Sequence, residues 1–293
     1  MAENITKNSY RYKGHESFVL RDGWITKGLI ELESSDGEDL FKNYYGADRL
    51  GVGPNMAKAI RYWMEVAGLL EVKAGKARLT RLGKILYEYD RYIEDVFTLW
   101  LLHVQIVTNM TKATAWYQFF SEFEMDEFTK DELKEVMQNL ALLYCGQEKA
   151  PSMNSVTADC EAILQMYARE KNKDTDPEEK KKSPFYALGL VRTEGEKYRK
   201  TQPAKNSLDK SVVWLCINKA SQKTAISIDE LTTSPVGPGK VLNLKRAMIS
   251  EYIDELVENE KIHVNRTAGL DMVYMNEAQS VEEIARDYYT DRK

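Results

Sequence analysis

A single stretch, residues 50–79, restricts the fold more than any other, because a helix signal passes directly into a hairpin signal there. Gly51 and Gly53 favour a tight turn, and Pro54 fits the first position of a helix, where no backbone N–H donor is needed. Gly68 is a typical residue to end that helix. After it, LLEV, KAGKA and RLT predict a strand, a turn and a second strand.

The predicted helix has one apolar and one polar side. Apolar residues recur at the spacing of a single helix face and form the expected inner stripe: Met56, Ile60, Trp63 and Ala67. The opposite side is expected to carry Asn55, Lys58, Arg61, Tyr62 and Glu65. We therefore expect this helix to pack on a core through one face and to leave the other face available for a partner.

Two further helices are predicted upstream. Asp22 can cap the first, whose inner side carries Trp24, Ile25, Leu29 and Leu32, and the second runs roughly from Glu38 to Tyr45 and stops at Gly46. Thr80 can cap a helix that follows the hairpin. Helix, helix, helix and hairpin is the order of a winged helix-turn-helix, in which the last helix enters the DNA major groove and the hairpin meets phosphates.

Charge is distributed unevenly along the chain. The net charge is −5, yet residues 49–84 hold eight cations against two carboxylates, whereas residues 91–168 hold five cations against twelve carboxylates. A dense basic segment favours contact with DNA, although a winged helix used for protein contacts, with a solvated basic face, remains the alternative. The predicted DNA-binding residues are Arg49, Asn55, Lys58, Arg61, Tyr62, Lys73, Lys76 and Arg78.

The whole chain is expected to be mainly α. We predict a winged-helix DNA-binding domain at 1–90, a central helical bundle at 91–168, a charged linker at 169–184 and a C-terminal α+β winged-helix-like domain at 185–293. The linker holds eleven charged residues and two prolines. The C-terminal prediction rests on an amphipathic helix, Lys245 to Asn259, followed by a hairpin around Ala268 and Gly269. His103 lies in an apolar helix and is expected to be a hydrogen-bonded core residue.

Motifs for chemistry are weak. SPVGPGKV, residues 234–241, lacks the glycine spacing and the Ser/Thr of a phosphate-binding loop. Asp90, Glu94 and Asp95 could hold magnesium, but capping is the commoner role for such acids. Three well-separated cysteines predict reduced core residues in a cytoplasmic protein, with no metal site. No run is long enough to span a membrane, and no signal-peptide core is evident.

Four blocks resemble a known family: GHESFVLRDGWITKGL, LGVGPNMAKAIRYW, LTRLGKILYEYDRYIEDVFTLWLLH and TAGLDMVY. They lie, in order, between residues 14 and 274. They resemble a bacterial family long labelled as a domain of unknown function and typified by SspB, a component of single-stranded DNA phosphorothioation systems. Residues 169–210 follow none of these blocks.

The resemblance implies a role in DNA modification and phage defence, beside cysteine desulfurase and PAPS-reductase-like partners. It implies a winged-helix protein that nicks DNA, with Mg or Mn as the metal such nicking would need. No nuclease motif can be carried over, so His15 and Glu16 are only weak catalytic candidates, and the pair is expected to begin the fold. The alternative is a non-catalytic transcription regulator or an adaptor that recruits sulfur-transfer enzymes to DNA. A homodimer is one possible assembly of the chain.

Overall fold

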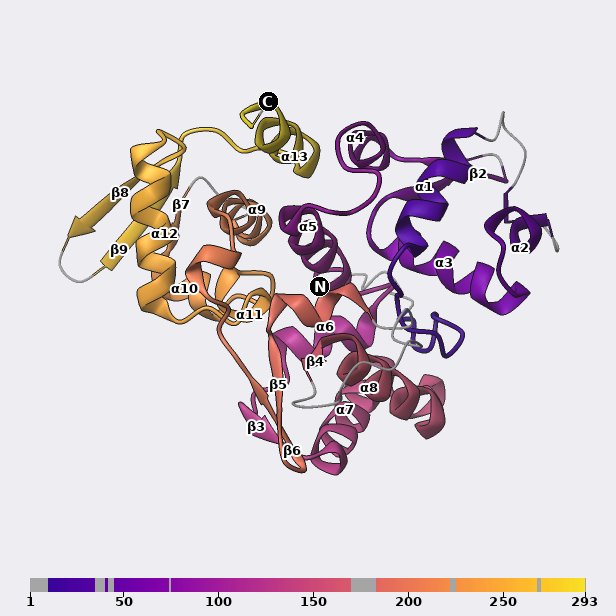
Figure 1. Cartoon of the computed structure of the whole chain (residues 1–293). Coiled ribbons are helices and arrows are strands. Elements are labelled where there is room, and N and C mark those ends of the chain that lie inside the picture. Colours follow the sequence, from indigo (N-terminus) through magenta and orange to yellow (C-terminus); the bar gives the residue numbers. More distant parts are fainter. Residues whose placement is uncertain are drawn as a thin grey trace, which may run out of the picture.

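The structure is a computed structural model that describes residues 10–34, 40–41, 45–73, 75–169, 183–221, 225–267 and 270–292. It is mainly helical, with three small sheets, as the sequence predicts at this coarse level (Figure 1). The buried apolar residues form one continuous core that extends from the N-terminal helices to α13 at the other end of the chain. No helix in the described ranges is long and apolar enough to cross a bilayer.

The N-terminal part begins with helix α1, Trp24–Ser34, which packs on helix α3, Pro54–Val66. The predicted inner residues of α1 are buried, and α3 begins with Pro54 after Gly53, as expected. Gly28 of α1 lies against the Met64 side chain of α3, because a Cβ atom at Gly28 would be 1.9 Å from the Met64 Sδ atom. A larger residue at this position would therefore force the Met64 side chain to move.

The second predicted helix was misplaced. Leu40 and Phe41 form a turn, and the observed helix α2 runs Tyr45–Leu50, so Gly46 lies inside the helix instead of ending it. The rest of the predicted span up to residue 44 lies outside the described residues. The apolar residues at 40, 41 and 44 gave a helical spacing, but the backbone turns at the first two of them.

The hairpin follows as predicted. Strand β1, Leu70–Lys73, pairs antiparallel with β2, Lys76–Leu79, and Leu70 lies opposite Leu79. Gly75 has a positive φ of 77°, a conformation that glycine adopts without a steric penalty. Helix α4, Arg81–Tyr89, starts from a cap in which the Thr80 hydroxyl accepts a hydrogen bond from the Gly83 backbone N–H.

Four helices make up most of the central part: α5, Val96–Val107; α6, Thr114–Ser121; α7, Lys130–Cys145; and α8, Met153–Tyr167. His103 on α5 is fully buried and hydrogen-bonded to the Tyr167 hydroxyl and the Val241 carbonyl, at 2.9 and 2.8 Å. Burial lowers the pKa of His103 to about 4, and the bond to Val241 acts in the opposite direction. The expectation of a hydrogen-bonded core histidine is confirmed.

This part is not entirely helical. Strands β3, Glu127–Phe128, and β4, Ala168–Arg169, join the hairpin of β5, Val191–Glu194, and β6, Lys197–Lys200, in a sheet of order β3-β6-β5-β4. The pairing therefore crosses the predicted linker, of which 170–182 lie outside the described residues. Ser183, placed at the end of that linker, is buried. The domain division itself stays a prediction.

Short 3-10 helices complete the region: η1, Gln147–Lys149; η3, Pro184–Leu188; and η4, Lys205–Ser207.

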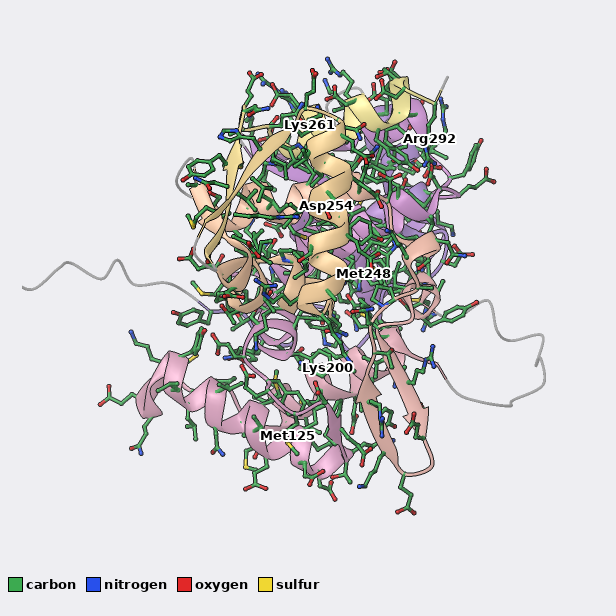
Figure 2. All side chains as sticks on the ribbon, turned by 90° about the vertical axis from the view of Figure 1, so that its left-hand side faces the viewer. Met125, Lys200, Met248, Asp254, Lys261 and Arg292 are labelled. Atoms are coloured by element: carbon green, nitrogen blue, oxygen red, sulfur yellow. The ribbon has the colours of Figure 1, made fainter. Side chains whose placement is uncertain are left out.

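The C-terminal part again contains a helix followed by a hairpin, α12 and β8–β9. Strand β7 pairs with β9, and β9 with β8, giving the order β7-β9-β8. Figure 2 looks onto helix α12, on which Met248 and Asp254 are labelled. The elements are α9, Lys210–Ala220; β7, Ala225–Ser227; α10, Ile228–Thr233; α11, Pro238–Val241; α12, Arg246–Glu258; β8, Ile262–Thr267; and β9, Leu270–Met275.

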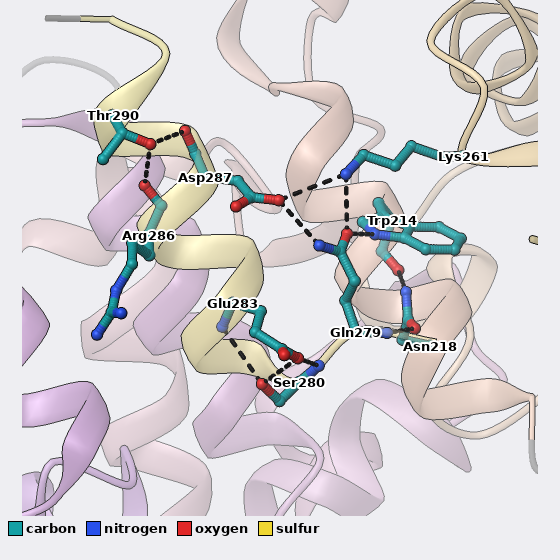
Figure 3. A network of polar contacts seen from close by, with 9 residues as sticks. All are labelled: Trp214, Asn218, Lys261, Gln279, Ser280, Glu283, Arg286, Asp287 and Thr290. Carbon is teal, nitrogen blue, oxygen red and sulfur yellow. Dashed lines mark hydrogen bonds and ion pairs between the residues drawn. The ribbon is translucent and has the colours of Figure 1, made fainter. Parts of the chain in front are cut away.

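A last helix, α13, Val281–Thr290, was not predicted; it lies between α9 and α4 (Figure 1). Asp287 on α13 accepts hydrogen bonds from the Gln279 amide and the Lys261 ammonium, at 2.8 and 3.4 Å (Figure 3). Gln279 also accepts a bond from the Trp214 indole of α9. On its other side, the Tyr289 ring stacks on Tyr89 of α4. Helix α13 thus contacts both the N-terminal part, through α4, and the C-terminal part, through α9.

A buried histidine–aspartate pair and a candidate nucleic-acid interface

His15, one of the two catalytic candidates, lies inside the protein. Its Nε2 atom is 2.8 Å from Oδ1 of Asp159 on α8, and the two side chains are 1% and 0% exposed. The backbone N–H of Lys13 donates to both Asp159 oxygens at 3.0 Å. Burial raises the pKa of Asp159, and the hydrogen bond from His15 opposes that rise. The pair ties the N-terminal segment to a helix 144 residues away.

The segment around this pair is fitted closely against α3. A Cβ atom at Gly14 would lie 2.3 Å from the Tyr62 ring, and the His15 ring stacks on Trp63 with centroids 6.0 Å apart. Lys13 and Glu16 both have positive φ, at 54° and 52°. Such backbone angles cost energy in residues other than glycine, so the surrounding contacts must hold the segment in place.

Glu16, the other catalytic candidate, is exposed, whereas its neighbour His15 is buried. The two side chains therefore do not face a common space in which a substrate could meet both. The described residues contain no cluster of three or more His, Cys, Asp or Glu side chains arranged to hold a metal. The geometry supports the expectation that the opening motif builds the fold.

Two of the three acids considered for magnesium, Asp90 and Asp95, accept hydrogen bonds from nearby backbone N–H groups. Asp90 accepts hydrogen bonds from the backbone N–H groups of Glu94 and Asp95, at 2.9 and 3.1 Å. Asp95 in turn caps α5 by accepting from the Phe97 N–H at 2.8 Å, and it accepts a bond from the Tyr288 hydroxyl. These hydrogen bonds give the carboxylates of Asp90 and Asp95 a structural role that does not require a cation.

Three predicted DNA contacts lie on the first two turns of α3. Asn55 and Lys58 are exposed, Arg61 is half-buried, and the Lys58 ammonium donates to the Asn55 side chain at 3.3 Å. All three line a cavity of about 670 Å³, together with Phe18, Phe41 and other residues. The guanidinium carbon of Arg61 is 5.9 Å from the centre of the Phe41 ring. Cations and aromatic rings therefore border one hollow at the start of α3.

The hairpin carries the next three predicted contacts. Lys73, Lys76 and Arg78 are all exposed. Lys73 forms an ion pair with Glu71 at 2.7 Å, but its side chain is 66% exposed. Within the described ranges no carboxylate forms an ion pair with Lys76 or Arg78. These two charges are therefore available to an anionic partner.

The predicted outward position of Tyr62 is wrong, and Arg49 is engaged in an ion pair. Tyr62 is 2% exposed, and its hydroxyl donates to the Lys112 carbonyl at 3.1 Å, so it faces the core beside Trp63 and cannot reach DNA from the outer side of α3. Burial raises its pKa. Arg49 is partly neutralised, because its Nη2 atom lies 2.7 Å from Glu31 of α1. This ion pair connects α2 to α1 and weakens the case for Arg49 as a phosphate ligand.

Sequence reasoning missed Asp159, Phe18 and Phe41. Asp159 is a single acid in an amphipathic helix, and nothing local marks it as the partner of a distant histidine. Phe18 lies within the opening block, and Phe41 lies in a span that was expected to be helical. Only the folded backbone brings the two phenylalanines to the same cavity.

The features described so far define a mainly helical protein with a basic N-terminal hairpin and a histidine–aspartate pair locked in its core. The chain belongs to the family described as Protein of unknown function (DUF4007), whose model matches residues 12–289. A comparison with curated proteins finds no match.

Two solved structures share the fold. One, described as an SspB crystal structure, has a TM-score of 0.82 at 23% identity, covering 97% of this chain and 89% of that one. The other, a magnesium ion-bound SspB crystal structure, has a TM-score of 0.79 at 22% identity, covering 96% and 94%. The resemblance to an SspB-like family of unknown function is confirmed.

Proposed function

We propose that this chain binds DNA through helix α3 and the β1–β2 hairpin, used as a winged helix, and serves as a DNA-nicking component of a bacterial DNA phosphorothioation and phage-defence system. The observation that carries the proposal is the set of cations on these elements that lack ion-pair partners among the described residues: Lys58, Arg61, Lys76 and Arg78.

Physical reasons favour DNA as the partner of this surface. Cations on an exposed hairpin can replace the counterions of a phosphate backbone, which drives binding by releasing those counterions. The SspB-like fold supports the phosphorothioation context, in which cysteine desulfurase and PAPS-reductase-like proteins would be the partners.

The nicking part of the proposal rests on the likeness to the SspB structures. The magnesium in the second related structure belongs to that protein, and among the described residues here no three candidate ligands come together. We therefore assign no catalytic step to a metal. The second candidate function is a non-catalytic adaptor or regulator that brings other enzymes to DNA, and it needs only the DNA-binding surface.

Salt dependence of DNA binding tests the interface. Changing Lys76 and Arg78 to alanine together should lower the slope of log affinity against log salt by about 2, roughly 1 for each lost phosphate contact. The matched control is Lys197→Ala with Arg199→Ala, because these cations also alternate along a hairpin strand but form ion pairs with Glu127. An equal change in both variants would show that net charge alone governs binding and would contradict the proposal.

A plasmid assay separates the two candidate functions. Supercoiled plasmid incubated with the pure protein and Mg²⁺ or Mn²⁺ should become open circular if the protein nicks DNA. Salt-sensitive binding without any open-circular product would favour the adaptor. If the protein does not bind DNA at low salt, both candidates are wrong.

A further inference from the structure

The cavity at the start of α3 has a size and lining that a simple groove-reading helix does not require. Its volume of about 670 Å³ is within the range of pockets that hold small organic ligands, ~300–1,000 Å³. Phe18, Phe41 and Met56 supply an apolar wall, while Lys58 and Arg61 supply positive charge. A ligand with a flat apolar part and an anionic part would match both features.

The end of α3 adds hydrogen-bond donors to this cavity. Gly53, Pro54, Asn55 and Met56 all line it, and no side chain caps the helix at Gly53. The backbone N–H groups of Asn55 and Met56 come before the first intrahelical bond, which runs from Ala57 N–H to the Gly53 carbonyl. Such donors at the positive end of a helix are suited to an anion, and Lys58 lies one turn further along.

We propose that this cavity binds one unstacked nucleotide of a DNA strand, with its base against the phenylalanine wall and its phosphate at the start of α3. The inference rests on the proposed DNA-binding function and adds the kind of DNA that is bound: a strand with an unpaired, extruded base. Base stacking on aromatic rings combined with backbone contacts to cations is the usual way in which proteins hold unpaired bases.

The test compares three forms of one labelled duplex by fluorescence anisotropy with the full chain. One is perfectly paired, one has a single bulged thymidine, and one has a bulged abasic site that keeps the backbone but lacks the base. The bulged thymidine should bind about tenfold more tightly than the abasic bulge, which is the effect of one base–aromatic stack. Free thymidine monophosphate is added as a competitor in a separate series.

Gly53 allows a sharp pair of variants. A Cβ atom at Gly53 would have nothing within 4 Å, and its φ of −67° and ψ of 157° suit any residue. Gly53→Leu should narrow the cavity beside the start of α3 and weaken the preference for the bulged base, while the cations of the hairpin still bind the paired duplex. Gly53→Ala adds one methyl group in open space and should behave like the native protein. Phe41→Leu, checked for an unchanged thermal midpoint, should weaken the preference by removing the aromatic face without narrowing the cavity.

Each outcome has a definite meaning. Equal affinity for the bulged thymidine and the abasic bulge, with the paired duplex still bound, would overturn this inference and leave the proposed function intact. A preference that is unchanged in both Gly53→Leu and Phe41→Leu, each shown to be folded, would place the base elsewhere and also overturn it. If free thymidine monophosphate competes as well as the bulged strand at the same concentration, the ligand of the cavity is a small molecule and not a DNA strand. This outcome would also overturn the inference. If no DNA form is bound, the proposed function and the inference are both wrong.

Discussion

Replacing His15 by leucine is the most informative perturbation of the core, because it separates a structural histidine from a catalytic one. The change removes the hydrogen bond to Asp159 but leaves that carboxylate buried at 0% exposure, with only the Lys13 N–H as a donor. Leaving a buried acceptor without its hydrogen-bond donor costs about 1–3 kcal/mol, and more when the group is charged. We therefore expect His15→Leu to lower the free energy of unfolding by at least about 1 kcal/mol.

Urea denaturation, followed by tryptophan fluorescence and by circular dichroism, measures the change. The neighbouring Glu16→Gln is the control, because Glu16 is exposed and surface substitutions usually shift stability by less than about 0.5 kcal/mol. A double variant, His15→Leu with Asp159→Leu, should be more stable than His15→Leu alone, because the uncompensated carboxylate is then absent.

Two results would refute this reasoning. A loss below about 1 kcal/mol in His15→Leu would mean that the hydrogen bond between His15 and Asp159 does not stabilise the fold as a buried hydrogen bond should. Loss of plasmid nicking in either single variant, with stability and DNA affinity unchanged, would place the opening motif in an active site and make the structural interpretation wrong.

Two further outcomes test the core. Trp63→Ala should cost about 3–5 kcal/mol, because the fully buried ring is lost along with its indole bond to the Phe18 carbonyl, and an unchanged thermal midpoint would contradict the packing described for α3. His103 should make stability fall as pH drops from about 6.5 to about 4, because the unfolded chain takes up the proton first, and the loss should reach about 3 kcal/mol. A His103→Gln variant, with no imidazole to titrate there, should show a flatter pH profile of stability over the same interval.

Local patterns were enough to predict the elements that depend on neighbouring residues. The buried residues Ile60, Trp63 and Ala67 of the predicted α3 stripe, the cap at Thr80 and the hairpin at residues 70–79 all follow from spacing and from turn residues within a few positions. Met56, the first residue of that stripe, is half-buried and lines the cavity. The helix α12 and the hairpin after it were found in the same way. In each case the signal and the structure lie within one short segment, so no knowledge of the rest of the chain is needed.

Elements that depend on distant partners could not be predicted. Strands β3 and β4 are only two residues each and exist because the β5–β6 hairpin pairs with them. The outward assignment of Tyr62 failed because helical spacing places it beside Arg61, whereas the segment at Gly14 covers that side of α3. Spacing defines a helix face, but it does not reveal which other segment of the chain covers that face.

The same dependence on distant partners links the buried pair to the proposed DNA surface. His15 stacks on Trp63, and Gly14 fits against Tyr62, so the segment held by Asp159 of α8 contacts the inner side of the helix whose outer side carries Lys58. Weakening the pair should therefore disturb the position of α3 before it affects any chemistry. A partial loss of DNA affinity in a destabilised His15 variant, recovered in the double variant with Asp159→Leu, would be the sign of this positional effect. A catalytic histidine would not be rescued by removing its partner.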